Sequence, residues 1–475
     1  MTSRNPMMRP SFSPCCSIVP PYLLAALAQS GDHDLAAVAE QTLHHDHELR
    51  ARRRTRSAAR PGAATGPQDG YTTQHRDIYD AGGSTTLPGT LVRGEGDPQS
   101  SDVAVNEAYD GLGDTWNFYD QVFSRNSIDG RGLGLIGTVH YGQRYDNAFW
   151  NGEQMVFGDG DGTLFGRFTA SIDVIGHELT HGVTQNTANL AYSDQPGALN
   201  ESVSDVFGVL VKQRTLGQTA DQADWLIGAG LLMPGVQGRA LRDMLHPGTA
   251  YDDPRLGKDP QPADMAHYVQ TTSDNGGVHI NSGIPNRAFA LAATTIGGHA
   301  WLGAGQVWYD VLTGSQITPQ CDFATFAQLS VDAADARFGA GSAESHAVRR
   351  AWGTVGVLGS APPASRGGAW GGSVGDVPGD ALVRVTRTGG FAGVSREATV
   401  RLDELSGADA ATWRSLLGSG VLRQASRIES SDSAVRDGFC YSVRCAGQGV
   451  DATLDEGVLP DVVRDLLDRT VRGVG

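Results

Sequence analysis

Cysteine is scarce in this chain of 475 residues, which carries only Cys15, Cys16, Cys321, Cys440 and Cys445. The odd number and uneven spacing predict no disulfide framework, although a single Cys440–Cys445 bridge stays open. No apolar run reaches the ~18 residues that a membrane-spanning helix needs, so we expect no membrane partner. Positive charge is also in deficit, because the formal net charge is -16. This acidic balance argues against nucleic acid as a partner.

Glycine, by contrast, is abundant with 63 residues, and its distribution helps to divide the chain into regions. Residues 70–175 hold short strand-like runs between glycine turns, whereas residues 175–357 are mostly helical in pattern. A β-rich part followed by a helical part predicts an α+β fold with a cleft between two lobes. We expect a Gly/Pro/Ser linker at 358–380 and a small α+β domain at 381–475.

The N-terminal stretch CCSIVPPYLLAALAQSG has some features of a secretory signal peptide, with arginines before it and a small-residue motif near its end. Two prolines interrupt its apolar run, however, and a short amphipathic helix is expected after it. That helix ends in an arginine run followed by PGAATGPQDG, which is typical of an exposed, cleavable segment. A signal peptide stays open, but a propeptide is favoured. Localisation is therefore open between the cytoplasm and secretion by a non-classical route.

The motif DVIGHELTHGVTQ carries the strongest chemical signal in the chain. His177 and His181 are four residues apart, so in a helix they lie on one face and can both bind a single zinc ion. Glu178 is rotated by about 100° from His177 and can act on a metal-bound water instead of binding the metal. An exposed helix that happens to carry these residues is the alternative.

The third metal ligand is expected on the next predicted helix, within GALNESVSD. Glu201 follows His181 after 19 residues, and a catalytic zinc site needs three protein ligands and one open position. Asp205 lies one turn further along and can accept a hydrogen bond from a ligand histidine. A carboxylate pair with this spacing is also common on solvated helix faces.

The spacing from HELTH to NESVSD resembles the thermolysin family of zinc endopeptidases, and the similarity extends over most of residues 70–357. It implies a thermolysin-like, two-lobed α+β fold, one catalytic Zn²⁺ and peptide or protein substrates. The resemblance also implies that Glu178 is the general base. Tyr192 and His279 would stabilise the oxyanion, and Asp274 would orient His279.

Further segments imply a substrate site. By resemblance, Asn147 and Arg242 would hold the peptide backbone. The main specificity pocket would be lined by Phe165, Phe168, Val174, Ile227 and Leu241, which are all apolar and imply cleavage before large hydrophobic residues.

The family's double calcium site is the one clear departure. Asp173 and Asp224 are retained, but Lys212, Leu226 and Ala229 stand at three other carboxylate positions. A tight Ca²⁺ site needs six to eight oxygen ligands, so we expect the double calcium site to be lost. Bound Ca²⁺ elsewhere is not excluded.

Both ends of the chain have their own resemblances. Residues 1–65 resemble the short propeptide of protealysin-type enzymes through a motif formed by Pro20, Pro21, Tyr22 and Leu23. This resemblance implies an autoprocessed precursor with peptidase lobes at 66–185 and 186–357.

Residues 381–475 resemble the inhibitor emfourin through TRTGGFAG, which includes Gly389, Gly390 and Phe391. A restraining domain acting within the same chain is thus expected. The alternatives are an accessory binding module and, for the whole chain, a non-catalytic zinc-binding scaffold.

Overall fold

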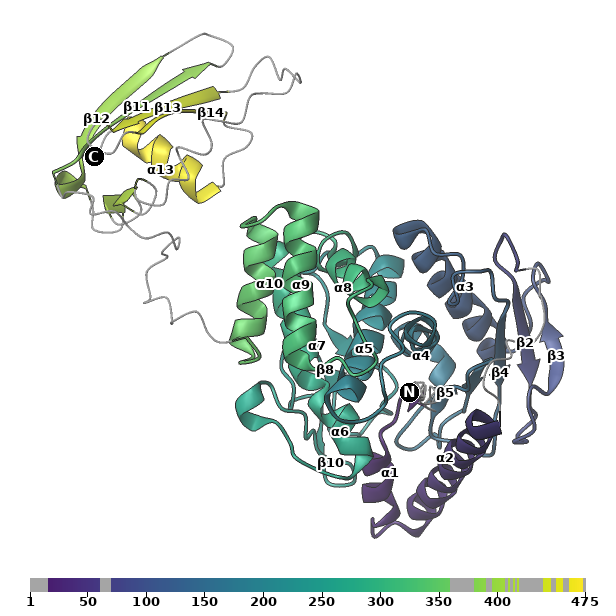
Figure 1. The fold of residues 1–475 in the computed structure, drawn as a ribbon. Coiled ribbons are helices and arrows are strands. Elements are labelled where there is room, and N and C mark those ends of the chain that lie inside the picture. The colour runs from purple at the N-terminus through teal and green to yellow at the C-terminus, as the bar shows by residue number, and fades with distance from the viewer. Residues whose placement is uncertain are drawn as a thin grey trace, which may run out of the picture. The chain divides into compact units, whose positions relative to one another are not determined.

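The computed structural model describes residues 16–59, 70–358, 380–389, 395–405, 409–410, 413–414, 417, 439–445, 450–455 and 461–472. The chain divides into two compact units, Met1–Ser360 and Ala361–Gly475 (Figure 1). No helix among the described residues is long and apolar enough to cross a membrane.

The first unit contains a six-stranded sheet in the order β1-β5-β6-β4-β2-β3. Its strands are β1 (Cys16–Ser17), β2 (Arg76–Asp80), β3 (Thr90–Arg93), β4 (Leu135–Val139), β5 (Ala148–Trp150) and β6 (Met155–Phe157). Strands β2, β4 and β6 run parallel, and the other pairings are antiparallel. Helix α3 (Val103–Phe123), a long helix within the region expected to be strand-rich, packs on this sheet.

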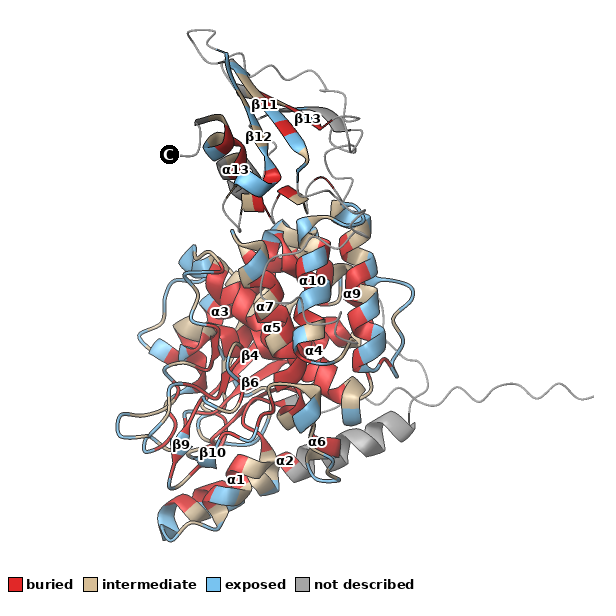
Figure 2. Ribbon diagram, turned by 90° about the vertical axis from the view of Figure 1, so that its left-hand side faces the viewer, coloured by how far each residue is buried: buried red, intermediate tan, exposed pale blue. Residues whose placement is uncertain are grey.

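The rest of the first unit is mainly helical, as the sequence predicts. The helices are α4 (Ile172–Gln185), α5 (Asp194–Leu216), α6 (Asp274–Asn281), α7 (Gly283–Ile296), α8 (Ala304–Thr313), α9 (Phe323–Phe338) and α10 (Ala343–Thr354). Two small ribbons accompany them: β7 (Leu226–Ile227) with β8 (Arg242–Asp243), and β9 (Asp252–Asp253) with β10 (Gly257–Lys258). Helices α4 and α5 lie in the buried centre (Figure 2).

Two glycines allow α4 and α5 to cross closely. A Cβ atom on Gly208 would lie 2.4 Å from the carbonyl oxygen of Asp173 and 3.0 Å from the nitrogen of His177. A Cβ on Gly176 would lie 3.0 Å from the Cα of Gly208. Since even one extra methyl group would clash, the small residues set the distance between the helices and bring the HELTH motif beside the second helix.

The N-terminal segment is part of the core of the first unit. Helix α1 (Pro21–Ala28) buries Leu23, Leu24 and Leu27, and α2 (His33–Ala59) buries Leu35 and Val38. The predicted helix is present and its last turns contain most of the arginine run, but at 27 residues it is not short. Straight-chain arginine is a good helix former, so the run suits a helical segment.

The second unit is a four-stranded antiparallel sheet in the order β12-β11-β13-β14. Its elements are β11 (Leu382–Gly389), β12 (Arg396–Arg401), β13 (Phe439–Cys445), β14 (Val450–Asp455) and α13 (Asp461–Arg472). Helix α13 contributes Leu466 and Leu467 to a core with Val383 and Val385. The open possibility of a Cys440–Cys445 bridge is wrong, because the two cysteines are not joined in a disulfide. They lie at opposite ends of β13 and, being five residues apart, point to opposite faces.

Candidate active site

The imidazoles of the HELTH motif converge with a carboxylate from the next helix. The Nε2 atoms of His177 and His181 are 3.1 Å apart. Glu201 oxygens lie 3.5 Å from His177 Nε2 and 3.6 Å from His181 Nε2. Zinc bonds of ~2.0–2.1 Å in a tetrahedron put neighbouring ligand atoms about 3.3 Å apart. The three buried side chains, each with one ligand atom within 4.8 Å of the others, can therefore bind one zinc ion.

Each histidine is oriented through its other ring nitrogen. Nδ1 of His177 lies 2.8 Å from Asp205, and Nδ1 of His181 lies 2.8 Å from Asn200 Oδ1 and 3.0 Å from Ser204 Oγ. Such contacts fix the ring so that Nε2 faces the metal. Burial lowers the pKa of His181 to about 4, so its imidazole is neutral and can offer a lone pair at neutral pH.

Asp205 binds more than the histidine that the sequence assigned to it. Its two oxygens accept hydrogen bonds from Nε and Nη2 of Arg242, both at 2.8 Å, and from Nδ2 of Asn286 at 2.8 Å. Burial opposes ionisation of Asp205, but the charge of Arg242 and the contact with His177 outweigh it and hold the pKa well below its usual value. Asn286, which the sequence did not single out, thus completes a buried polar network.

Tyr192 and His279 lie beside the metal-binding group. The Tyr192 hydroxyl donates to Glu201 and lies 3.2 Å from His279 Nε2. The other ring nitrogen of His279 is 2.7 Å from Asp274, whose second oxygen accepts the His279 backbone N–H at 2.9 Å. Burial disfavours the His279 cation, but Asp274 and Glu201 outweigh it and raise the pKa of His279.

A left-handed backbone run makes the Asp274–His279 contact possible. Residues Asp274, Asn275, Gly276 and Gly277 all have positive φ, from 51° to 89°. A Cβ on Gly276 would lie 2.4 Å from a carboxylate oxygen of Asp194. Glycine suits this position because it adopts positive φ without a steric penalty and leaves room for a neighbour.

Glu178 is fully buried next to this group, and its Oε2 accepts the Trp150 backbone N–H at 2.9 Å. Strand β5 and the metal-binding helix α4 are thereby connected at the residue that the motif assigns as general base.

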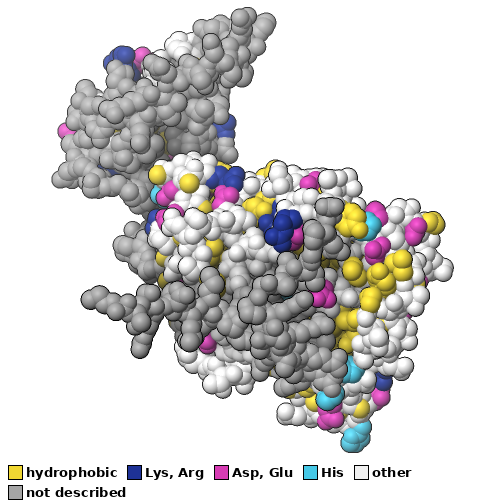
Figure 3. Space-filling view, turned by 45° about the vertical axis from the view of Figure 1, so that its right-hand side comes forward, with side chains coloured by type: hydrophobic (Ala, Val, Ile, Leu, Met, Phe, Trp, Pro, Cys, Tyr) yellow, Lys and Arg dark blue, Asp and Glu magenta, His cyan; other side chains and the backbone are white. Residues whose placement is uncertain are grey.

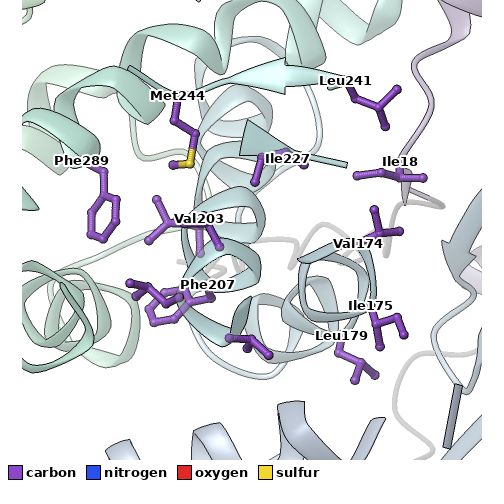
Figure 4. Close-up of a cluster of buried hydrophobic side chains, with 14 of the residues drawn as sticks. Ile18, Val174, Ile175, Leu179, Val203, Phe207, Ile227, Leu241, Met244 and Phe289 are labelled. Atoms are coloured by element: carbon purple, nitrogen blue, oxygen red, sulfur yellow. The ribbon is translucent and has the colours of Figure 1, made fainter. Parts of the chain in front are cut away.

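The two expected backbone-binding residues hold the N-terminal segment. Asn147 Oδ1 accepts the Val19 N–H at 2.9 Å, and its Nδ2 donates to the Val19 carbonyl at 3.2 Å. Arg242 Nη1 donates to the Ile18 carbonyl at 3.2 Å. The Ile18 side chain lies near Val174, Ile227 and Leu241 (Figure 4). The remaining pocket residues, Phe165 and Phe168, are also buried, with ring centroids 6.1 Å apart.

Helix α2 also reaches the backbone-binding residue, which the sequence did not predict. Asp46 accepts a hydrogen bond of 2.5 Å from the Tyr145 hydroxyl and one of 3.1 Å from Asn147 Nδ2. Nearby, Asp34 pairs with Arg144 at 2.9 Å. The partners of these two aspartates lie on the loop before β5. The helix α2 therefore holds the peptidase through contacts additional to those of Ile18 and Val19.

The proline motif begins helix α1. Pro20 is the N-cap and Pro21 the first helical residue, a position that proline favours. Burial together with nearby Tyr251 and Asp259 raises the pKa of Tyr22 well above its usual value, and Leu23 is buried. In the C-terminal unit, Gly389 ends β11, whereas Gly390 and Phe391 lie outside the described residues.

Lys212 occupies the region expected for calcium. Its ammonium is 3.1 Å from Asp173, 2.8 Å from Asp224 and 2.7 Å from the Leu226 carbonyl. Burial disfavours the charged lysine, but Asp173 and Asp224 outweigh it and raise its pKa. A covalently attached cation thus sits among oxygens that could otherwise bind a metal.

The surface carries both charged and large apolar side chains. On the face shown in Figure 3, the described Lys and Arg side chains stand singly among acidic ones. Among the residues of the first unit whose burial is described, the exposed large apolar ones are Tyr71, Leu91, Val92, Val103, Leu216 and Leu302.

Comparison with known proteins shows the family of the first unit. Residues 62–185 match the family model of the thermolysin metallopeptidase catalytic domain, and residues 188–357 match that of its alpha-helical domain. An extracellular metalloprotease of Pectobacterium carotovorum is 53% identical over 72% of this chain and 97% of its own length. The chain belongs to the thermolysin family of metallopeptidases. The family is zinc-dependent, in agreement with the fit of His177, His181 and Glu201 to a zinc ion.

Other relatives refine this assignment. Protease PrtS of Photorhabdus is 56% identical over 54% of this chain and 70% of its own length. The solved precursor of protealysin from Serratia proteamaculans is 54% identical, with a TM-score of 0.65, and covers 72% of this chain and 99% of its own. Residues 385–471 match the emfourin family model, so this thermolysin-family chain also carries an emfourin domain. The predicted fold class and enzyme class are confirmed.

Proposed function

We propose that this metallopeptidase hydrolyses peptide bonds with Glu178 as general base and with His279 and Tyr192 as donors to the oxyanion. A bound zinc ion would polarise the scissile carbonyl and acidify a water molecule. Glu178 takes the proton of that water and passes it to the leaving amine. Asp274 orients His279 and raises its pKa, which favours the charged imidazole that suits a donor to developing negative charge. Arg242 and Asn147 hold the substrate backbone.

The observation that carries this proposal is the spacing of the metal-binding group. One ligand atom from each of the three side chains lies within 4.8 Å of the others, and Glu178 stands next to His177 on the same helix. A non-catalytic scaffold would bind zinc but has no need of Glu178. Glu178→Gln should therefore keep zinc and lose peptide cleavage, whereas Glu153→Gln, an exposed control, should keep both. Cleavage by Glu178→Gln at the wild-type rate would contradict Glu178 as general base, and a parent that binds zinc without cutting peptide would favour the scaffold.

The N-terminal residues act in this proposal as a propeptide that blocks the site until it is removed. The hydrogen bonds of Ile18 and Val19 to Arg242 and Asn147 support this role, as does the burial of α1 in the same core. An intact chain should be inactive on an added peptide, and activity should appear with loss of the N-terminal segment in mass spectra. An N-terminus at Gln29 in exported protein would instead indicate a signal peptide.

The emfourin domain restrains the peptidase within the same chain. Tethering by a ~20-residue linker gives an effective concentration on the order of mM, so even a weak inhibitor would remain bound. Removal of residues 358–475 should raise the activity of the propeptide-free enzyme on a small peptide. Unchanged activity, with the isolated domain also failing to inhibit in trans, would favour an accessory binding module.

Two further points belong to the proposal. The substrates are peptides cut before large hydrophobic residues, because Ile18 lies in one buried apolar cluster with Val174, Ile227 and Leu241 (Figure 4). The mature enzyme works outside the cell, as the word "extracellular" in the names of two relatives suggests. Fractionation of a producing culture tests the second point.

A further inference from the structure

The N-terminal strand β1 pairs with β5 in a defined register. Strands β1 and β5 are antiparallel, with Cys16 opposite Trp150 and Ser17 opposite Phe149. The Ile18 N–H donates to the Ala148 carbonyl at 3.1 Å. In an antiparallel ladder the backbone groups of alternate residues point away from the partner strand. Because Ile18 faces β5, the N–H and carbonyl of Ser17 face the other way.

Two contacts bracket the Ser17–Ile18 bond within the catalytic site. On one side, the Trp150 N–H opposite Cys16 also donates to Glu178 Oε2 at 2.9 Å. On the other side, the Ile18 carbonyl accepts from Arg242, whose guanidinium binds the same Asp205 that holds His177. The bond thus lies between the contacts of the general base and those of a metal-binding histidine.

The residues that follow the bond are seated as a substrate would be. Ile18 and Val19 are both 0% exposed. The Ile18 side chain lies beside Leu241 in the buried apolar cluster (Figure 4). Asn147 binds both backbone groups of Val19. A peptide that only obstructed the site would not need both the antiparallel pairing with β5 and a side chain at the position of Ile18 in the apolar cluster.

We infer that Ser17–Ile18 is a self-cleavage site of the precursor, an inference that rests on the proposed function. One water molecule is consumed as the C–N bond breaks, leaving a carboxylate on Ser17 and an ammonium group on Ile18. The new terminus keeps its contacts to Arg242 and Asn147 and remains tied to α1 and α2. This cut therefore precedes, and differs from, the later removal of the whole segment.

Mass spectrometry of the full chain after addition of zinc tests the inference. A product that starts at Ile18 should form, at a rate constant independent of protein concentration, and should be absent from Glu178→Gln. Ile18→Val, which removes one methylene from the pocket, should slow the cut about tenfold. Ile18→Asp should abolish it, whereas Ala26→Asp, at an exposed position of α1, should leave it unchanged. Absence of the Ile18 product from an enzyme that cuts casein overturns the inference, and failure to cut casein after propeptide removal overturns the proposed function instead.

Hydrogen–deuterium exchange tests the pairing of the N-terminal segment with β5 without any need for catalysis. In metal-free Glu178→Gln, the Ile18 and Val19 amides should exchange with solvent deuterium at least tenfold more slowly than in the same protein carrying Ile18→Asp. Ala26→Asp should leave this protection unchanged. Equal exchange in the parent and in Ile18→Asp would contradict the register on which the cleavage site depends.

Discussion

Replacement of Lys212 by methionine tests whether a lysine has taken over the structural role of a cation. Methionine keeps most of the aliphatic chain and removes the ammonium group. That group contacts Asp173 at 3.1 Å and Asp224 at 2.8 Å. The Asp173 side chain is 1% exposed, so its carboxylate would stay buried without a counter-charge. Asp224 is 46% exposed and would be largely hydrated.

The size of the effect follows from this difference in burial. Breaking a buried ion pair by removing one partner costs about 3–5 kcal/mol. Asp173 keeps two neutral donors, Ser171 Oγ at 2.5 Å and the Gly228 N–H at 3.2 Å, which favours the lower end of that range. The exposed pair with Asp224 adds less than about 1 kcal/mol. We therefore expect a loss of about 3 kcal/mol, or about 4 °C in Tm for a unit the size of Met1–Ser360.

Thermal unfolding in the Glu178→Gln background, which prevents self-digestion, measures the change. Lys258→Met is a matched control, because Lys258 is the other lysine of the chain and is exposed. It should shift Tm by less than about 1 °C. A calcium chelator should leave the Tm of the parent unchanged. A shift below 1 °C for Lys212→Met, or a marked loss of Tm on calcium withdrawal alone, would refute the reasoning.

The pH dependence of this difference supplies a second check. Lys212 has its pKa raised in the folded chain. Its stabilisation is therefore fully present below the unfolded value near 10.5 and is lost only as the pH rises through the higher folded value. The gap between parent and Lys212→Met should stay constant from pH 6 to 9.

Three other substitutions test separate parts of the molecule. Gly208→Ala should destabilise the chain by about 1–3 kcal/mol, because the new methyl group overpacks the α4–α5 crossing, and should weaken zinc binding in a chelator competition. Burial and the charge of Asp161 raise the pKa of Asp146 to about 8, so parent stability should fall as the pH rises from about 4 to 8. Asp146→Asn should flatten this slope in thermal unfolding. Asn286→Leu should lower kcat/KM and zinc affinity about tenfold or more, since Asp205 loses a buried donor; unchanged values in both assays would make Asn286 dispensable.

Local patterns predicted the parts of the site that depend on a single helix. The four-residue spacing of His177 and His181 fixes their common face wherever the helix lies, and Glu178 follows from the same geometry. The assignment of Glu201 needed only a second helix packed against the first. The spacing of these motifs, together with the resemblance, was therefore sufficient for the metal-binding group.

Contacts between distant segments were not visible in the sequence. Asp205 is 37 residues from Arg242 and 81 from Asn286, and no periodicity connects them. Helix α3 was missed for a different reason. Its glycines read as turns, but Gly111 lies where a Cβ would come within 2.3 Å of Ile175, and Gly113 where it would meet Arg76 at 2.3 Å. These glycines allow close packing of α3 against its neighbours. In the sequence alone, a glycine needed for close packing looks the same as a glycine needed for a turn.

The two N-terminal helices explain how a cleavable segment could still keep the enzyme inactive. Any peptide substrate can compete for the hydrogen bonds that hold Ile18 and Val19, because those bonds involve backbone groups. Helix α2 adds a side-chain contact outside that backbone site, from Tyr145 to Asp46, and shares Asn147 with the extended segment. Since α2 remains covalently joined to Ile18 after a cut at Ser17–Ile18, the segment stays at high effective concentration. Release then depends on a second cut after α2 or on loss of its contacts, so the two processing events would have separable rates.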